Sequence, residues 1–248
     1  MEDYVIAEEY TLPSQGKVYS KQIDPDIKIR SMTTEEEMKR LAHSESQFKL
    51  LSEIIDDCLI KKPAISTYDM CIGDYQFLMH KLRVVTYGAD YKVNTTCPVC
   101  GKLNEETIDL DKLEVVPYSE ELNKYLNITL PRTNKHIELR LQTPRMLDEV
   151  NRKSKELLKK SPNLKGEPAI LFTLQSVIAK VDGEVLDPIK LESFVRRLPA
   201  ADSNYILKCL DKIDIGVNPR LSCKCSQCNT YYNAVLPITG EFFGPSID

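Results

Sequence analysis

Several features that would assign this chain to a membrane or enzyme class are missing from its sequence. No apolar run approaches the roughly 18 residues of a membrane-spanning helix, so we expect a protein that does not cross a membrane. None of the motifs G-x-x-x-x-G-K-[ST], G-x-G-x-x-G, H-E-x-x-H or G-x-S-x-G occurs, and these mark nucleotide, metalloprotease and hydrolase sites. The three histidines have no metal-ligand partner at a useful spacing, and tryptophan is absent, which excludes nothing. We therefore expect that the protein is not an enzyme.

The composition is that of a globular protein kept in a reducing compartment. The 248 residues are 42% hydrophobic and 28% charged, which suffices for one large core or two small ones. A net charge of −4 argues against broad, non-specific binding to nucleic acid. Residues 1–4 are acidic and lack the basic and apolar regions of a signal peptide, so we expect the chain to stay in a cytoplasm. In that compartment, eight cysteines favour a metal site over disulfide bonds.

Two Cys-x-x-Cys pairs are the strongest signal in the sequence. Cys97 and Cys100 form the first pair, and Cys225 and Cys228 form the second. Each pair lies between β-prone segments, which predicts a loop at the tip of a β-hairpin. Four thiolates are the ligand set of a tetrahedral structural zinc site, which has no open position for water. Gly101 follows the first pair, where such a turn often needs a positive φ.

The spacing between the pairs is far longer than in an ordinary zinc ribbon. Residues 101–224 separate them, whereas roughly 15–20 residues are usual. A zinc ion (Zn²⁺) would therefore tie the C-terminal part of the chain to its middle. Cys223 is an alternative to Cys225 as a ligand, although Cys225 gives the two-residue spacing. A redox-active pair and a set of buried free thiols are the other interpretations, and the βαβ setting of a thioredoxin-like site is absent.

Capping signals and apolar periodicity predict an α+β fold in three parts. Residues 1–90 are expected to form a short β element and a small helical bundle. Residues 91–126 and 218–248 are expected to form a split zinc ribbon made of two hairpins, and residues 127–217 an inserted β-hairpin followed by helices. The expected helices span about residues 34–43, 46–58, 74–87, 144–160, 169–180, 188–197 and 200–212.

One segment of the predicted insertion is basic. Between residues 145 and 165, lysine and arginine outnumber the acidic residues. Such a segment could contact an acidic partner or nucleic acid, but a solvated helix face explains it more simply.

Several stretches together resemble the baseplate hub assembly protein family of T4-like contractile-tailed bacteriophages. The matching stretches are Leu12-Pro13-Ser14-Gln15-Gly16-Lys17-Val18-Tyr19, Met32-Thr33-Thr34-Glu35-Glu36-Glu37, Asp74-Tyr75, Leu82-Arg83-Val84-Val85-Thr86-Tyr87-Gly88 and the two Cys-x-x-Cys pairs. The resemblance covers most of the chain, and the predicted insertion is where least can be matched.

This resemblance implies a non-enzymatic baseplate hub component, or an assembly chaperone, that binds other tail proteins. The hub and the tape-measure protein are among the partners to expect. The place of action would be the host cytoplasm during assembly, with the virion baseplate as the further location of a component that stays.

A zinc ribbon that binds nucleic acid or assists transcription is the alternative function. Lys102 and Lys224 flank the two pairs, and Tyr231 and Tyr232 supply aromatic rings. Acidic residues follow the first pair closely, however, whereas a nucleic-acid surface should be basic. We therefore do not expect nucleic acid to be the main partner.

Overall fold

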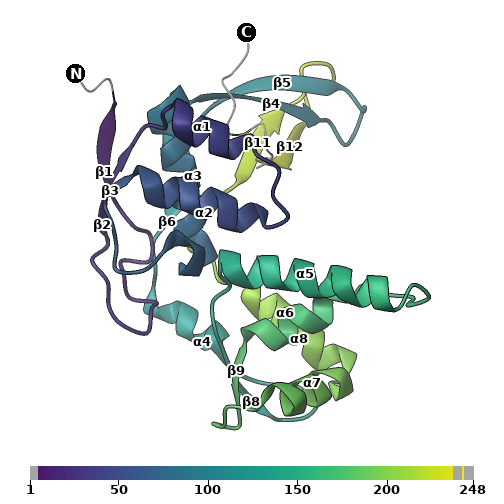
Figure 1. Cartoon of the computed structure of the whole chain (residues 1–248). Coiled ribbons are helices and arrows are strands. Elements are labelled where there is room, and N and C mark those ends of the chain that lie inside the picture. Colours follow the sequence, from purple (N-terminus) through teal and green to yellow (C-terminus); the bar gives the residue numbers. More distant parts are fainter. Residues whose placement is uncertain (1–4, 237–241, 243–248) are drawn as a thin grey trace.

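Two hydrophobic cores organise the fold in a computed structural model, which describes residues 5–236 and residue 242 (Figure 1). The first core draws on residues 12–110 and on residues from 217 onward, whereas the second draws on residues 128–209. The chain therefore leaves the first core, builds the second and returns. Within the described residues the fold is α+β, with eight α-helices and five small antiparallel sheets.

The first core is formed largely by a three-stranded sheet and two helices, and a shorter helix, α1 (Thr34–Arg40), packs against the second helix of the chain. The other elements are β1 (Ala7–Thr11), β2 (Asp26–Arg30), β3 (Leu59–Lys61), α2 (Gln47–Cys58) and α3 (Ile72–Tyr87). The predicted capping box of α1 is present, because the Thr33 side chain accepts from Glu35 N and the Glu36 carboxylate accepts from Thr33 N at 2.8 Å. Such a box satisfies backbone donors that have no partner inside the helix. Helix α1 ends at Arg40, three residues before the predicted end at residue 43.

A buried carboxylate on α3 holds the predicted turn at residues 12–19. Ser14 N donates to Asp74 Oδ1 at 2.9 Å, and Ser14 Oγ and Tyr19 OH both donate to Asp74 Oδ2 at 2.5 Å. Asp74 is completely buried, so these three donors replace the water that a buried carboxylate loses. Desolvation raises the pKa of Tyr19 well above its ordinary value, which keeps this donor protonated. Two stretches that the sequence places 60 residues apart are therefore joined by one side chain.

Two β-hairpins lie beside the first core, at the points predicted from the cysteine pairs. They consist of β4 (Asp90–Thr96) with β5 (Leu103–Asp109), and of β11 (Arg220–Lys224) with β12 (Tyr231–Val235). Along β4 and β11 buried and exposed residues alternate strictly, as expected for a strand with one covered face. A short pair, β6 (Val115–Val116) with β10 (Gly216–Val217), brings the returning chain back to the first core.

The second core combines a three-stranded sheet with four helices. These are α4 (Asn123–Leu126), β7 (Asn127–Thr129), β8 (His136–Leu139), α6 (Ala169–Val177), β9 (Ile178–Val181), α7 (Pro188–Arg197) and α8 (Ala200–Leu210). Helix α5 (Pro144–Lys160) packs against α6 and lies outside this core. Thr143 caps α5 and Asp187 caps α7, and each is followed by proline at the first helical position, where proline is well tolerated. The described residues also form three short 3₁₀ turns, η1 (Thr67–Asp69), η2 (Leu110–Lys112) and η3 (Glu120–Leu122).

The predicted helix at residues 169–180 is too long. Helix α6 ends at Val177, and the next four residues form β9, which pairs with β8. The segment is apolar, and an apolar run of this length suits a buried helix or a strand equally well. Pairing with a distant strand decides between them. The Asp-Gly turn that follows is present, with φ values of 51° at Asp182 and 84° at Gly183.

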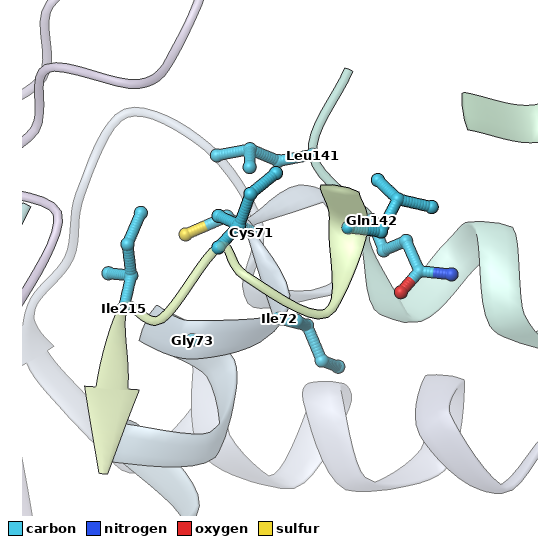
Figure 2. A pocket seen from close by; sticks show the side chains of 8 residues that line it. Cys71, Ile72, Gly73, Leu141, Gln142 and Ile215 are labelled. Atoms are coloured by element: carbon cyan, nitrogen blue, oxygen red, sulfur yellow. The ribbon is translucent and has the colours of Figure 1, made fainter. Parts of the chain in front are cut away.

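The two cores meet at the N-terminus of α3. Ile72 N donates to Gln142 O at 2.9 Å, and the backbone of Ile215 lies directly against Gly73. Beside these contacts lies a pocket of about 50 Å³. Figure 2 shows it with Cys71 and Leu141 among its lining residues. Asp148 on α5 makes a further link, because its Oδ2 accepts from Lys49 N at 3.0 Å and from Tyr68 OH at 3.1 Å.

Some expectations concern segments at the ends of the chain. Residues 1–4, on which the expectation of a missing signal peptide rests, lie outside the described residues, as do residues 237–241 and 243–248 of the predicted ribbon. The division into a part at residues 1–90, a split ribbon at 91–126 and 218–248, and an insertion at 127–217 stays a prediction. In the part of the chain that the structure describes, no helix has the length and apolar character needed to cross a membrane.

Replacing Gly73 by alanine tests the close approach between the two cores. A Cβ atom at this position would lie 2.2 Å from the carbonyl oxygen of Ile215, and backbone cannot move aside as a side-chain end can. We expect the free energy of unfolding to fall by about 1–3 kcal/mol, the usual cost of overpacking. Chemical denaturation measures it, with Gln76→Ala at a partly exposed position of the same helix as the control. Equal stability of the two variants would contradict the close approach.

Candidate metal centre

Four cysteine side chains from two distant parts of the chain converge on one point. The Sγ atoms of Cys97, Cys100, Cys225 and Cys228 all lie within 4.8 Å of one another. Cys97 and Cys225 are buried, whereas Cys100 and Cys228 are exposed. All four are free thiols. The structure thus brings together the four residues that the sequence predicts as ligands, and they could hold a metal ion.

The two loops that carry the cysteines have the same construction. In the first hairpin Thr96 pairs with Leu103, and in the second Lys224 pairs with Tyr231, so each pair of strands encloses six residues. The first cysteine of each loop donates its N–H across the loop, Cys97 to Lys102 O and Cys225 to Thr230 O, both at 2.9 Å. Each loop is therefore closed in the same way and presents both sulfurs from one tight turn.

The fifth residue of each loop has a left-handed backbone conformation. Gly101 has the predicted positive φ, at 71°, and Asn229 stands at the equivalent position with a φ of 57°. Their N–H groups donate back to the first cysteine of the loop, at 3.0 Å in both cases. Asparagine is one of the few residues other than glycine that tolerates this conformation. The sequence gives no sign that Asn229 takes the same backbone conformation as Gly101, because only the glycine is an obvious turn signal.

A buried asparagine joins the two hairpins just below the sulfurs. The Oδ1 atom of Asn104 accepts hydrogen bonds from Ser226 N at 3.0 Å and from Ser226 Oγ at 2.8 Å. Its Nδ2 donates to the Tyr232 hydroxyl at 3.2 Å, and that hydroxyl lies 2.7 Å from Thr95 Oγ1. The β4–β5 hairpin is therefore connected to the β11–β12 hairpin by side chains as well as by the sulfurs. No spacing rule marks Asn104, Ser226 or Tyr232 in the sequence.

The second loop favours the thiolate form of its cysteines. The N–H of Cys228 lowers the pKa of the Cys225 thiol to about 6, and hydrogen bonding with the Thr230 hydroxyl lowers the pKa of Cys228. For Cys100 the Lys102 backbone lowers the pKa, but desolvation and hydrogen bonds with the other sulfurs outweigh this and raise the pKa to about 12. The thiolate is the form of cysteine that binds metals, so the loop prepares part of the ligand set in advance.

Cys223 lies on the same face of β11 as Cys225 but does not belong to the group of four. It pairs with Tyr232 in the hairpin and is 1% exposed. Two residues along a strand correspond to about 7 Å, which places its sulfur below the sulfur cluster. Burial raises the pKa of Cys223, so this thiol is expected to stay protonated.

The other cysteines and the histidines lie elsewhere. Cys58 and Cys71 are buried in the first core region and Cys209 in the second. His80 is 3% exposed, its Nδ1 lies 2.8 Å from Gln76 O, and burial lowers its pKa. Among the described residues, the group of four cysteines is the one cluster whose geometry suits a metal ion.

Replacing Asn104 by alanine tests the connection between the hairpins. The change leaves Ser226 and Tyr232 without their shared partner in a region where Asn104 itself is 5% exposed. We expect a loss of about 1–3 kcal/mol in the free energy of unfolding, the cost of leaving buried polar groups unpaired. The matched control is Asn94→Ala on the exposed face of β4, which should cost less than about 0.5 kcal/mol. Chemical denaturation measures the free energy of unfolding of both variants. Equal losses in the two variants would contradict the role of Asn104.

Comparison with known proteins assigns the chain to a family. Residues 5–244 match the model of one protein family, which is described as T4 bacteriophage base plate protein. No curated protein and no solved structure matches the chain. The family match covers nearly all of the sequence, including both hairpins and the helices between them. The chain therefore belongs to the T4 bacteriophage base plate protein family, and its role lies in the baseplate of a phage tail.

Proposed function

We propose that the protein is a non-enzymatic component or assembly chaperone of the baseplate hub that works by binding other tail proteins. The family match over residues 5–244 carries this proposal. A baseplate is an ordered assembly of protein subunits, so a member of the family acts through its surfaces. Partners are expected to be tail proteins such as the hub or the tape-measure protein. The protein then acts in the host cytoplasm during assembly and, if it is a component, in the virion baseplate.

We also propose that the four cysteines hold a structural zinc ion and form a split zinc ribbon. Zinc–sulfur bonds of about 2.3 Å place the sulfurs of a regular tetrahedron about 3.8 Å apart. The Cys97–Cys228 and Cys100–Cys225 sulfur distances of 3.7 Å and 3.5 Å are close to this value. Four thiolates complete the coordination of zinc and leave no position for a reacting water. This ligand set supports a structural role, in agreement with a function that involves no catalysis.

The proposed ion would fix two hairpins whose cysteine pairs are separated by residues 101–224. A binding surface loses less free energy on association when its parts are held in place beforehand. Zinc at the hairpin tips would hold β4–β5 and β11–β12 together for this purpose.

Replacing Cys97 and Cys100 by serine should release the zinc and loosen the hairpins. A cross-link over more than 100 residues contributes about 4–5 kcal/mol, and each kcal/mol changes the Tm of a protein of this size by roughly 2–4 °C. We therefore expect the Tm to fall by roughly 8–20 °C, measured by calorimetry, and the zinc content measured by plasma mass spectrometry to fall from one ion per chain to none.

Cys223→Ser is the matched control, since this thiol lies next to the group but outside it. It should keep one zinc per chain. Loss of zinc in the control would mean that the proposed ligand set is wrong. An unchanged Tm in the double variant would contradict the structural role of the zinc.

Partner capture tests the function itself. The tagged protein is recovered from phage-infected cells after nuclease treatment, and bound proteins are identified by mass spectrometry. We expect tail or hub proteins in stoichiometric amounts. If nuclease releases everything that is bound, the proposed binding of tail proteins is wrong and a nucleic-acid-binding ribbon replaces it.

Purified particles then separate the two forms of the proposal. A hub component should be present in mature virions at a fixed ratio to other tail proteins. A chaperone should be present in infected cells and missing from the particles. Quantitative mass spectrometry of both samples distinguishes these outcomes.

A further inference from the structure

A groove runs along the junction between the two cores. It consists of two open pockets, of about 340 and 310 Å³, that share Asp69, Arg140, Thr143 and Met146. Because they share these residues, the two pockets adjoin, and we call them together the junction groove. Pockets of roughly 300–1,000 Å³ can each hold a ligand of small-molecule size, and two adjoining ones offer space for a peptide segment.

Apolar side chains lie at both ends of the junction groove, among polar and charged ones. Val18, Tyr19 and Ile65 line the pocket on the side of the first core. Val150 on α5 and Phe172 on α6 line the other pocket, on the side of the second core. The groove is therefore built by both halves of the fold, and apolar side chains of a bound segment would find partners at both ends.

Most charged groups in the groove already neutralise each other. The Arg145 guanidinium holds Asp69 through two hydrogen bonds, from Nε at 2.6 Å and from Nη2 at 2.8 Å. Farther along α5, Lys153 Nζ lies 3.9 Å from a carboxylate oxygen of Glu149. These pairs balance the charges of the two carboxylates that line the groove.

Arg140 is different, because it has no carboxylate partner in the described part of the chain. Its Nη2 donates to Ile178 O at 3.0 Å, and the residue is exposed at the point where the two pockets meet. An arginine guanidinium presents donors in a fork that matches a carboxylate. The centre of a groove whose other charged groups are paired thus offers one uncompensated positive charge.

The helix that lines the groove continues into a basic region. Lys155, Lys159 and Lys160 on α5 and Lys165 in the following loop form no ion pair with any residue that the structure describes. The three helical lysines lie within about 11 Å of Lys153 along the helix axis, comparable with the screening length in physiological salt. Figure 1 shows this end of α5 extending beyond α6 and α8. The chain as a whole carries a net charge of −4, so this end of α5 is positively charged in a protein that is negatively charged overall.

We propose that the junction groove binds an extended acidic and apolar peptide segment of another tail protein, with a carboxylate of that segment on Arg140. The proposal rests on the proposed function, since it names the chemistry of the partner. A small molecule is a poorer match because both pockets are open along their length rather than enclosed. Nucleic acid is a poorer match because the groove has one uncompensated cation, and no series of exposed aromatic rings lines it.

A peptide array tests the proposal directly. Overlapping 15-residue peptides that cover the tail proteins of the same phage are probed with the full-length wild-type protein, and the bound sequences are titrated in solution by fluorescence anisotropy. We expect the bound peptides to carry net negative charge and apolar residues. Arg140→Gln should weaken their binding by about 10- to 100-fold, because it removes hydrogen bonds to a charged group.

The matched control is Arg132→Gln, which changes the net charge equally at another exposed arginine and should leave binding unchanged. A photo-crosslinker on the best peptide should label residues 18–20 or 172–176 in the wild-type protein, which locates the site without any variant. Circular dichroism with a thermal scan verifies that both variants fold.

Four results would overturn the proposal. They are an array without bound peptides, bound peptides that are neutral or basic, unaltered binding by Arg140→Gln, and crosslinks outside the groove. A single-stranded 30-nucleotide DNA is tested in parallel, and Arg140-dependent binding of this probe in place of peptides would identify a nucleic-acid site instead. If these tests fail while tail proteins are still captured from infected cells, only the groove assignment is wrong. If the wild-type protein captures no tail protein, the proposed function is wrong as well.

Discussion

The convergence of four sulfurs within 4.8 Å is the constraint on which the rest of the architecture depends. Residues 101–224 form one long loop between the two cysteine pairs, so everything in that loop must begin and end close to the same place. The structure meets this requirement by giving part of the loop its own core and by returning the chain beside α3. Closing a long loop costs conformational entropy, but the cost grows only slowly with length. A core of this size can therefore be inserted between the two halves of one site at little additional cost, and a metal ion or a polar network between the hairpins can offset that cost.

Local chemistry explains which parts of the fold could be predicted from the sequence. Thr33 with Glu36 and Asp187 with Pro188 each mark a helix start within a few residues, and the structure has a helix start at both. The Cys-x-x-Cys pairs and Gly101 likewise predicted the hairpin tips, because a tight loop with two sulfurs allows few backbone conformations. Strand β9 shows the opposite case. Its apolar residues are compatible with a helix, and only pairing with β8 makes them a strand.

In the candidate metal centre, too, some side chains could be predicted from the local sequence and others could not. The four sulfurs could be predicted from spacing, whereas the polar residues around them could not. Asn104 connects the hairpins through Ser226, which lies 122 positions away in the sequence, and an asparagine in a strand carries no sign of such a partner. Asn229 reproduces the backbone conformation of Gly101 without being a glycine. Spacing favoured Cys225 over Cys223, and the structure groups the Cys225 sulfur with the other three, whereas Cys223 lies two residues farther along the same face of β11.

The junction between the cores has attachments of its own, apart from the sulfur cluster. Before the chain reaches β11 and its cysteines, β10 pairs with β6, and the backbone of Ile215 packs against Gly73. On the other side of the junction, Asp148 and Arg145 of α5 hold Lys49 and Asp69. These contacts fix the second core against the first without using any cysteine. The walls of the junction groove are consequently positioned by backbone contacts and α5, whereas the hairpins are positioned by the sulfurs and Asn104. The sulfur cluster thus sets where the long loop must return, and these contacts set how the second core lies against the first within that loop.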